Sequence, residues 1–406
     1  MRRSLQFGAL VGCALIVAAC GKPGTDNGAK TSTGANSTTS AAPPPPPIVS
    51  PTLLNAGPYP TVPRPPLGAA GNPALGAVID AQQMADFVVG PWQFDDKLIT
   101  PYLSSFYVIS SPKSLMELGP EGVATAAGQH GLVNGFASAR QITDKTAVVN
   151  AVLRFPDPAA ASAAASAMGD AAAKQPVKGL TPTVTSIPGH PEAVASTYPF
   201  TPQGSVQSRA TVRAFTAHGP YVFMQFAQSV DGLDAATGLL AKAIDAQGPA
   251  IDQFKPADVG ALGAVPVDPT GLLARTLPAT STSAAKNAVY GTHGAEHFQS
   301  DPIASADLFK ATGLTEVAMG KTNVYQAKDA QSAVSIINEF NQEVSKEEGT
   351  TPAPAVPALP DSHCLAFPKG AYCIAPAGQY AIEARGDQLP DVQQQVAAQY
   401  VILTAK

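Results

Sequence analysis

Two histidines and a glutamate form the pattern in this chain that most resembles a metal site. His293 and His297 flank Glu296, and their four-residue spacing places two imidazoles on one face of a helix. A third ligand would have to come from Asp301, and Gly294 between the histidines weakens the helix. We therefore favour a structural, hydrogen-bonded role for both histidines near a domain junction, and we expect no metal and no cofactor.

Serine and lysine motifs of the penicillin-recognising enzymes are also present, in the order that those enzymes use. The motifs are Ser283-Ala-Ala-Lys286, Ser300-Asp301-Pro302 and Lys321-Thr322-Asn323. They follow one another too closely to build the helical domain and sheet that bring such groups together. Gly320-Lys321-Thr322 resembles the end of a phosphate-binding loop, but Thr315 stands where the first glycine is required. The sequence predicts no catalytic residue, and we favour a protein that is not an enzyme.

Cys20 is the residue whose chemistry the sequence indicates most directly. Arg2 and Arg3 precede an apolar stretch over residues 7–18, and small residues lead directly into Cys20. This order is typical of an export signal. A cysteine at the cleavage point is typical of a bacterial lipoprotein, in which the thiol receives a diacylglycerol before residues 1–19 are removed. We therefore predict lipid attachment at Cys20 and a location on the extracytoplasmic face of the cell membrane.

The export signal leaves alternatives open. If Cys20 is incidental, the chain is secreted without an anchor. The two arginines suit both general secretion and twin-arginine export. The pattern also does not encode the number of acyl chains, although two or more chains are needed for stable attachment because each buried CH2 contributes only about 0.8 kcal/mol.

The segment after the signal has the composition of a flexible linker. Residues 20–50 are rich in Gly, Ser, Thr, Ala and Asn, and they contain a run of five prolines. Because this composition has almost nothing to bury, we expect a disordered tether between the lipid and the folded body. The net charge of −5 is spread without long runs, which argues against a nucleic-acid partner. The expected partners are the membrane, through the lipid, and a cell-wall, lipid or protein ligand.

Cys364 and Cys373 are the cysteines that remain once Cys13 leaves with the signal peptide and Cys20 is lipidated. In an oxidising compartment an even pair is expected to form a disulfide. The residues between them are symmetric about Pro368-Lys369, so a hairpin that turns there sets the two cysteines directly opposite each other. A redox-active pair is the alternative, although such pairs usually have the closer Cys-X-X-Cys spacing.

The body of the chain uses one order of elements twice. After a short helix over residues 80–89, the first half predicts a strand over 146–155, an alanine-rich helix to 174, a hairpin of strands over 210–215 and 221–226, and a helix over 234–247. The second half predicts a strand over 323–326, a helix that opens at Asp329, the 364–373 hairpin, a strand over 380–384 and a helix over 391–403. Each half therefore reads as strand, helix, strands, helix.

This repetition predicts an α+β fold built from two related ferredoxin-like open sandwiches, each an antiparallel sheet with helices on one face. A generic α+β rhythm without duplication is the alternative. The Pro- and Gly-rich stretch between Lys255 and Pro278 is the expected boundary. The predicted parts are the signal peptide (1–19), the lipidated linker (20–50), an N-terminal domain (51–255) and a C-terminal domain that contains the disulfide (256–406).

Several motifs occur in this chain in the order typical of one protein family. They are Leu54–Arg64, Met84–Val88, Tyr290–Phe298, Val324–Ala330, and the cysteine pair before Tyr380. Together they resemble a family of actinobacterial envelope lipoproteins that is described only as a two-part N- and C-terminal domain of unknown function. This chain departs from the family's pattern at Asn55, Gln326 and Lys328. The resemblance implies an envelope location and supplies no catalytic residues.

Taken together, these patterns predict a lipid-anchored envelope protein that binds or scaffolds a ligand without catalysis. An envelope hydrolase or transferase with an unrecognised site is the alternative. Buried carboxylates clustered in an open cleft, or the two histidines with a third ligand, would favour the enzyme. A shallow apolar groove would favour binding.

Overall fold

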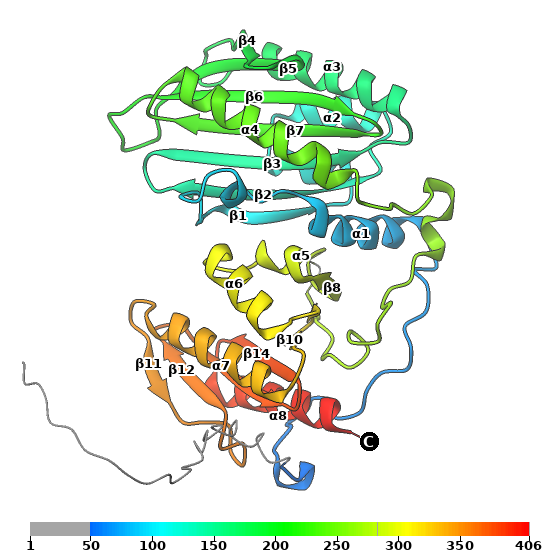
Figure 1. The fold of residues 1–406 in the computed structure, drawn as a ribbon, viewed down its shortest axis with the longest axis vertical. Coiled ribbons are helices and arrows are strands. Elements are labelled where there is room, and N and C mark those ends of the chain that lie inside the picture. The colour runs from blue at the N-terminus through cyan, green and yellow to red at the C-terminus, as the bar shows by residue number, and fades with distance from the viewer. Residues whose placement is uncertain (1–48, 282, 406) are drawn as a thin grey trace, which may run out of the picture. The chain divides into compact units, whose positions relative to one another are not determined.

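The computed structural model describes residues 49–281 and 283–405, which contain two antiparallel sheets of seven strands each (Figure 1). The N-terminal sheet has the strand order β1-β2-β3-β7-β6-β5-β4. Its strands are β1 (Thr100–Ile109), β2 (Asn134–Ile142), β3 (Thr146–Arg154), β4 (Thr183–Ile187), β5 (His190–Phe200), β6 (Arg209–His218) and β7 (Tyr221–Ser229).

The C-terminal sheet repeats this order. Read from β8, its strands follow one another as β8-β9-β10-β14-β13-β12-β11. The strands are β8 (Ala288–Gly291), β9 (Glu316–Met319), β10 (Asn323–Gln326), β11 (Thr351–Ala353), β12 (His363–Phe367), β13 (Gly370–Ala377) and β14 (Tyr380–Gly386). Each strand of one sheet therefore has a counterpart at the same place in the other.

The helices follow the same repeat. The α-helices are α1 (Pro73–Met84), α2 (Glu121–Gln129), α3 (Pro158–Lys174), α4 (Leu233–Ile251), α5 (Thr292–Glu296), α6 (Pro302–Thr312), α7 (Ala330–Ser345) and α8 (Leu389–Thr404). Short 3-10 helices are η1 (Pro51–Leu53), η2 (Ala85–Phe87), η3 (Pro91–Gln93), η4 (Pro112–Glu117) and η5 (Val259–Ala264). Helices α2, α3 and α4 occupy the places in the chain order that α6, α7 and α8 occupy in the second half.

Local sequence signals explain where the principal helices begin. The carboxylates of Asp157 and Asp329 accept hydrogen bonds from backbone N–H groups in the first turns of α3 and α7, so both predicted caps are confirmed. Helix α1 begins at Pro73, with Asn72 as its cap, and ends at Met84. The helix predicted over residues 80–89 therefore begins and ends earlier in the chain, because Asn72 caps it and Pro73 occupies its first position.

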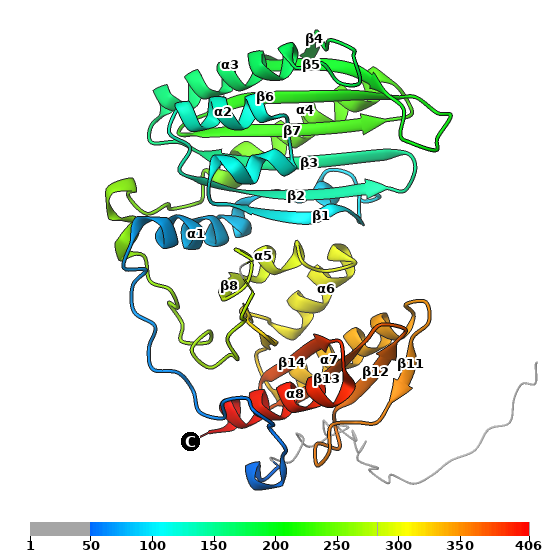
Figure 2. The same cartoon turned by 180° about the vertical axis from the view of Figure 1, so that it is seen from behind.

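The predicted α+β class with two antiparallel sheets is confirmed, but the helices cover both faces of each sheet. In β3, Val148 packs with α4 on one face, while Val149 packs with α2 and α3 on the other. In the second half, Tyr372 packs with α7 and Cys373 packs with α8. Figure 1 shows α4 and α7 in front of their sheets, and Figure 2 shows α2, α3 and α8 from behind.

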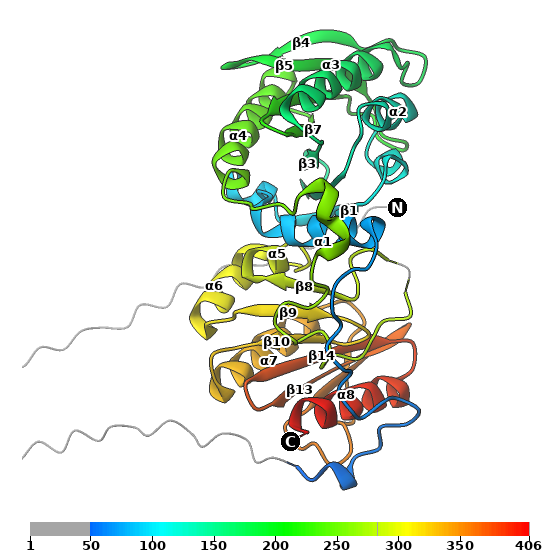
Figure 3. The ribbon, with the colours of Figure 1, turned by 90° about the vertical axis from the view of Figure 1, so that its right-hand side faces the viewer.

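This two-sided arrangement corrects the single-faced, ferredoxin-like sandwich that the sequence predicted. Figure 3 shows each sheet with helices on both sides. The physical reason is that the central strands bury both faces: every residue of β3 is buried. A strand with two buried faces needs a covering layer on each.

The predicted hairpin and disulfide are confirmed. Phe367 pairs with Gly370, and Cys364 pairs with Cys373, across the turn between β12 and β13. The two cysteines form a disulfide with their Cα atoms 4.1 Å apart. Both cysteines are buried in the apolar layer between the sheet and α8.

The predicted lipid site and most of the linker lie outside the described residues. This applies to Cys20, to the signal peptide and to residues 20–48. In the part of the chain that is described, none of the helices combines the length and the apolar character that a membrane span requires.

Candidate functional site

The two histidines of the predicted metal pattern lie where α5 meets the N-terminal half of the chain. His293 Nδ1 is 2.9 Å from Glu296 Oε2, and its Nε2 is 3.1 Å from the carbonyl oxygen of Val88. His297 Nδ1 is 2.9 Å from Ser138 Oγ, and its Nε2 is 3.1 Å from the carbonyl oxygen of Ala85. All four ring nitrogens thus have protein partners.

Electrostatics separate the roles of these two rings. Burial lowers the pKa of His297 well below its usual value, and the neighbouring charges of His293 and Arg140 lower it further. Burial also lowers the pKa of His293, but the hydrogen-bonded carboxylate of Glu296 outweighs this effect and raises it. Within residues 49–281 and 283–405, no three His, Cys, Asp or Glu side chains come together as a metal site.

Arg140 and Asp86 tie the two halves together beside the histidines. The fully buried Arg140 of β2 donates hydrogen bonds to the carbonyl oxygens of His297 at 2.8 Å and Gln299 at 2.9 Å. The carboxylate of Asp86 accepts the backbone N–H groups of Gly291 at 3.0 Å and Gly294 at 2.7 Å. This arrangement is a structural joint, because most of its polar groups pair with one another; Arg140 Nε is buried without a hydrogen-bond partner among the described residues.

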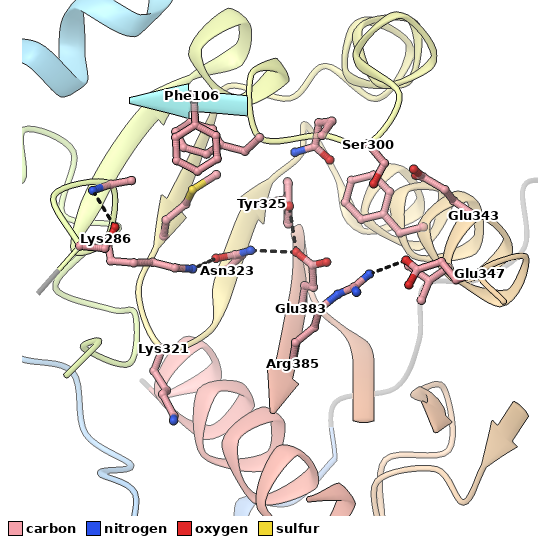
Figure 4. A pocket seen from close by; sticks show the side chains of 17 residues that line it. Phe106, Lys286, Ser300, Lys321, Asn323, Tyr325, Glu343, Glu347, Glu383 and Arg385 are labelled. Carbon is pink, nitrogen blue, oxygen red and sulfur yellow. Dashed lines mark hydrogen bonds and ion pairs between the residues drawn. The ribbon is translucent and has the colours of Figure 1, made fainter. Parts of the chain in front are cut away.

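A pocket formed by the C-terminal half together with Phe106 of β1 is the better candidate for a functional site. It has a volume of about 390 Å³ and lies against β10, β14 and α7. Its lining residues are Phe106, Ser283, Ala285, Lys286, Phe298, Gln299, Ser300, Met319, Lys321, Asn323, Tyr325, Phe340, Glu343, Val344, Glu347, Glu383 and Arg385. Figure 4 shows these side chains around the cavity.

A chain of hydrogen bonds crosses the floor of this pocket (Figure 4). Lys286 Nζ donates to Asn323 Oδ1 at 3.1 Å, and Asn323 Nδ2 donates to Glu383 Oε2 at 2.9 Å. The hydroxyl of Tyr325 donates to the same oxygen of Glu383 at 2.9 Å. The second carboxylate oxygen of Glu383 has no hydrogen bond to the described residues, and it remains available as an acceptor.

Two further glutamates lie near the C-terminal end of α7: Glu343 is in its last turn, and Glu347 is two residues beyond its end. Glu347 forms an ion pair of 3.0 Å with Arg385 of β14, and both side chains are nearly half exposed at the mouth of the pocket. Glu343 lies one helical turn earlier and is half-buried. Burial raises the pKa of the Glu343 carboxyl; the Ser300 hydroxyl opposes the shift, while Asp301 and Glu383 add to it.

Aromatic side chains form the apolar part of the wall. The rings of Phe106 and Phe298 lie 4.2 Å apart between centroids. Phe340 of α7 is buried and contacts Tyr325, with 5.1 Å between their ring centroids. The pocket therefore combines fixed polar groups with apolar surface, as small-molecule sites commonly do.

The repeat within the chain supplies an internal comparison for the pocket. Strands β7 and β14 both begin with a tyrosine after a two-residue turn, so Glu383 corresponds to Met224 and Arg385 to Phe226. By the same register, Asn323 and Tyr325 of β10 correspond to Ala151 and Leu153 of β3. All four counterparts in the first half are buried apolar residues packed under α2 and α3.

In both halves an arginine lies against an aromatic ring at the same cross-strand pair, but the strand that carries the arginine in one half carries the aromatic residue in the other. In the first half, Arg213 lies 4.9 Å from the ring of Phe226, its partner across the strands. In the second half, Arg385 lies 5.0 Å from the ring of Tyr372, at the same paired position. This correspondence supports the residue-by-residue alignment of the two sheets.

The structure also brings together residues that the sequence had grouped for another reason. Ser283, Lys286, Ser300 and Lys321, from the rejected penicillin-recognising motifs, all line the pocket. The amine of Lys286 bonds to Asn323 instead of to either serine, and Lys321 points away from the hydrogen-bonded chain (Figure 4). The expectation that these motifs do not form that enzyme's site is consistent with this geometry.

Sequence reasoning missed the glutamates of the pocket and Arg385. A usable signal was present in β14, where Glu383 and Arg385 alternate with Ile382 and Ala384. Two charges on one face of a strand whose other face is apolar indicate an open or functional surface. Glu343 and Glu347 are four positions apart at the C-terminal end of a helix, a spacing that in sequence is typical of a solvated helix face.

The fold and the pocket define the class: an α+β protein made of one seven-stranded unit repeated, with a polar cavity in the second copy. Residues 67–267 match the N-terminal part, and residues 272–406 the C-terminal part, of the domain of unknown function DUF7373. The chain belongs to this two-part family, as the motifs predicted. An actinobacterial envelope location stays a prediction.

Other comparisons add little. No curated protein matches the chain. The extracellular domain of PknH from Mycobacterium tuberculosis is similar over 41% of this chain and 94% of that chain, with 14% identity and a TM-score of 0.28. A likeness of this strength carries no argument about fold or function.

Proposed function

We propose that this chain is a lipid-anchored protein of the cell envelope that binds a small ligand in its C-terminal pocket. The lipid anchor rests on the sequence pattern that ends at Cys20. The binding role rests on the pocket, and the two parts of the proposal have separate tests.

The contrast between the two halves is the observation that carries the binding role. The first half shows that the fold accepts apolar residues at these four positions, because Ala151, Leu153, Met224 and Phe226 pack there. The second half instead places polar and charged groups around a cavity at the same positions. Withdrawing such groups from water costs free energy, so their presence where the fold does not need them indicates a ligand.

The bonding pattern favours binding over catalysis. Glu383 is held by two neutral donors, and Glu347 is paired with Arg385. Of the described pocket hydroxyls, none is hydrogen-bonded to a histidine or lysine that could activate it as a nucleophile. The polar groups thus hold fixed positions, which suits recognition.

Glu343 is the observation that favours the second candidate, an envelope hydrolase or transferase. Buried carboxylates in an open pocket are the feature expected of an enzyme, and a glutamate whose pKa burial raises suits a general acid. The purified full chain would be incubated with cell-envelope extract and the products followed by mass spectrometry. Conversion that Glu343→Gln abolishes would establish the enzyme; the absence of any such conversion would leave binding alone.

Filling the pocket tests the binding role. Ser300 is an exposed residue at its wall, so Ser300→Trp should occupy the cavity without disturbing the core. Ser162→Trp, on the exposed side of α3, is the matched control. Native mass spectrometry of the full chain purified from membranes should find a small molecule bound to the wild type and the control, and none bound to Ser300→Trp. The proposal would be contradicted if Ser300→Trp still carried the bound molecule, or if the wild type carried no bound molecule.

Replacing Cys20 tests the anchor. Cys20→Ser should remove labelling by radioactive palmitate and move the chain from the membrane fraction to the soluble fraction, because lipid is the only proposed attachment. Cys13→Ser, inside the apolar signal stretch, is the control and should keep both the label and the location. A Cys20→Ser chain that is still labelled or still sediments with membranes would rule out this site.

A further inference from the structure

The charges of the pocket indicate the chemical class of its ligand. We infer that the ligand is a zwitterion, with a free amino group and a free carboxylate at opposite ends of an apolar body, which is the chemistry of a short peptide. This inference rests on the proposed binding function. It adds the identity of the groups that each side of the pocket recognises.

One side of the pocket presents an amine whose charge has no partner. Among the described residues, Lys286 forms no ion pair, and its amine donates a hydrogen bond to the neutral amide of Asn323. An ammonium group has three donors, so two remain for a ligand. Burial lowers the pKa of Lys286, and the nearby charge of Glu383 opposes this shift without a direct contact. A ligand carboxylate would supply the missing negative charge.

Asn323 explains why Lys286 remains unpaired. Its amide lies between Lys286 and Glu383 and bonds to both, with its oxygen toward the amine and its nitrogen toward the carboxylate. The two opposite charges are thereby kept from forming a direct ion pair. A direct pair would neutralise the pocket and leave nothing for a charged ligand to satisfy.

The other side of the pocket presents carboxylates. Glu343 forms no ion pair in the described part of the chain, and Figure 4 shows it across the cavity from Lys286, beyond Glu383 and Tyr325. The charge of Glu347 is already paired with Arg385. An adjoining hollow of about 430 Å³ between α6 and α7 shares Glu343 and adds the acidic residues Asp301, Asp307 and Glu339 together with Lys346. This excess of negative charge suits a ligand ammonium group.

Apolar side chains share the pocket with the charged groups. The paired rings of Phe106 and Phe298, together with Phe340 and Met319, form part of its lining. A volume of about 390 Å³ is at the small end of ligand sites. The pocket thus suits a compact molecule with an apolar part and two charged ends, the size of a dipeptide and not of a long chain.

The experiment compares peptides that differ only in their ends. The full chain, purified in detergent, would be dialysed to equilibrium against a pooled dipeptide library in four forms: free, N-acetylated, C-amidated and blocked at both ends. Retention would be measured by mass spectrometry. Each lost charge-assisted hydrogen bond should reduce retention by about ten- to a hundredfold, so the free form should be retained best. Glycerophosphoethanolamine, a lipid-derived zwitterion, would be included as a competing source of the same charges.

Two substitutions locate each end of the ligand. Lys286→Gln should abolish the preference for a free carboxylate over the amide while keeping the preference for a free amine. Glu343→Gln should do the reverse. Lys242→Gln on α4 and Glu121→Gln on α2 change the same charges at exposed sites of the first half, and both should leave the two preferences unchanged. A merely structural role of either pocket residue would lower all four forms equally.

The outcomes separate this inference from the proposed function. Equal retention of the four forms, or stronger retention of glycerophosphoethanolamine, would overturn the peptide assignment. In either case, if Ser300→Trp abolished the retention of those compounds, the binding function would stand. If Ser300→Trp left the retained molecules unchanged, the binding function would fail as well. A library from which nothing is retained would overturn the peptide assignment alone, because the co-purification experiment tests binding independently.

Discussion

At the scale of single residues, Asn323 decides the character of the pocket. Its counterpart in the first half, Ala151, cannot hydrogen-bond through its side chain, and the surrounding positions there are apolar. In the second half, the Asn323 amide orients Lys286 and Glu383 without joining them. The charge of the amine is thus available to a ligand, while the fold keeps both groups in fixed positions.

The protonation of Glu343 should make binding depend on pH. Burial raises its pKa, so as the pH falls this carboxylate is neutralised earlier than an ordinary glutamate. The affinity for a free dipeptide should therefore be full above that pKa and fall below it, by up to about tenfold per pH unit. The ligand's own carboxylate, with a pKa of about 3.3–3.7, stays ionised through most of this range.

Equilibrium dialysis between pH 7 and pH 4 would measure this loss of dipeptide affinity at low pH. Glu343→Gln should bind more weakly at neutral pH and should show little change in affinity as the pH falls. If the wild type and Glu343→Gln lost affinity equally as the pH falls, a group other than Glu343 would be responsible for the pH dependence.

At the scale of elements, the hairpin of β12 and β13 has separate tasks on its two faces. Cys364 and Cys373 pack toward α8, while Tyr372 faces α7, on the same side of the sheet as the pocket. The disulfide can therefore stabilise the sheet without touching the ligand site. This separation follows from the alternation of side chains along a strand.

Reduction of the disulfide should destabilise the fold by about 2.5–3 kcal/mol on the chain-entropy model, because the bridge closes a loop with a sequence separation of 9. Denaturant unfolding with and without reductant would measure the loss, and ligand retention should change little. The double variant Cys364→Ala, Cys373→Ala is the control and should not respond to reductant. If reductant lowered its stability by the same amount, the effect could not be assigned to this bridge.

At the scale of the whole chain, the described halves are joined through buried polar contacts. Arg140 of β2 reaches two carbonyl oxygens at the end of α5, and its guanidinium lies 5.4 Å from the ring of Trp92. His297 is fully buried beside that ring, with 5.1 Å between centroids. Such a joint couples the unfolding of the two halves, because separating them breaks these hydrogen bonds and exposes the buried rings to water.

Arg140→Met should uncouple the halves. It leaves the carbonyls of His297 and Gln299 without their donor, at about 1–3 kcal/mol for each group. Trp92 is the single tryptophan of the chain, so its fluorescence reports on this joint. In the wild type, the unfolding transition followed by Trp92 fluorescence should coincide with the transition followed by far-UV circular dichroism. In Arg140→Met, the fluorescence transition should occur at a lower denaturant concentration than the circular dichroism transition.

Arg213→Met is the matched control. Arg213 bonds the carbonyl oxygen of Leu118 within the N-terminal half, so its loss should lower stability while the two transitions still coincide. Coincident transitions in Arg140→Met as well would show that this residue does not couple the halves.

Much of the fold was predictable because its signals are local. Asp157 and Asp329 cap helices through their own backbone neighbours, and the turn at Pro368-Lys369 sets the hairpin register within ten residues. The candidate site was not predictable in this way. Lys286, Asn323 and Glu383 are separated by 37 and 60 positions, and no local pattern records that β10 pairs with β14 or that Lys286, before β8, reaches them.

The sequence by itself therefore determined the central strands and the helices that follow them, their repetition and the partners of the disulfide, whereas strands such as β1, β2, β8 and β9 were not predicted. Those properties depend on side-chain period, helix caps and turn residues, which act over a few positions. Only the tertiary structure decided that helices cover both faces of each sheet, that the two histidines satisfy hydrogen bonds at a joint, and that one face of the second sheet surrounds a charged pocket. The physical reason is that burial and charge pairing depend on which distant strands lie side by side, and that is a property of the assembled sheet.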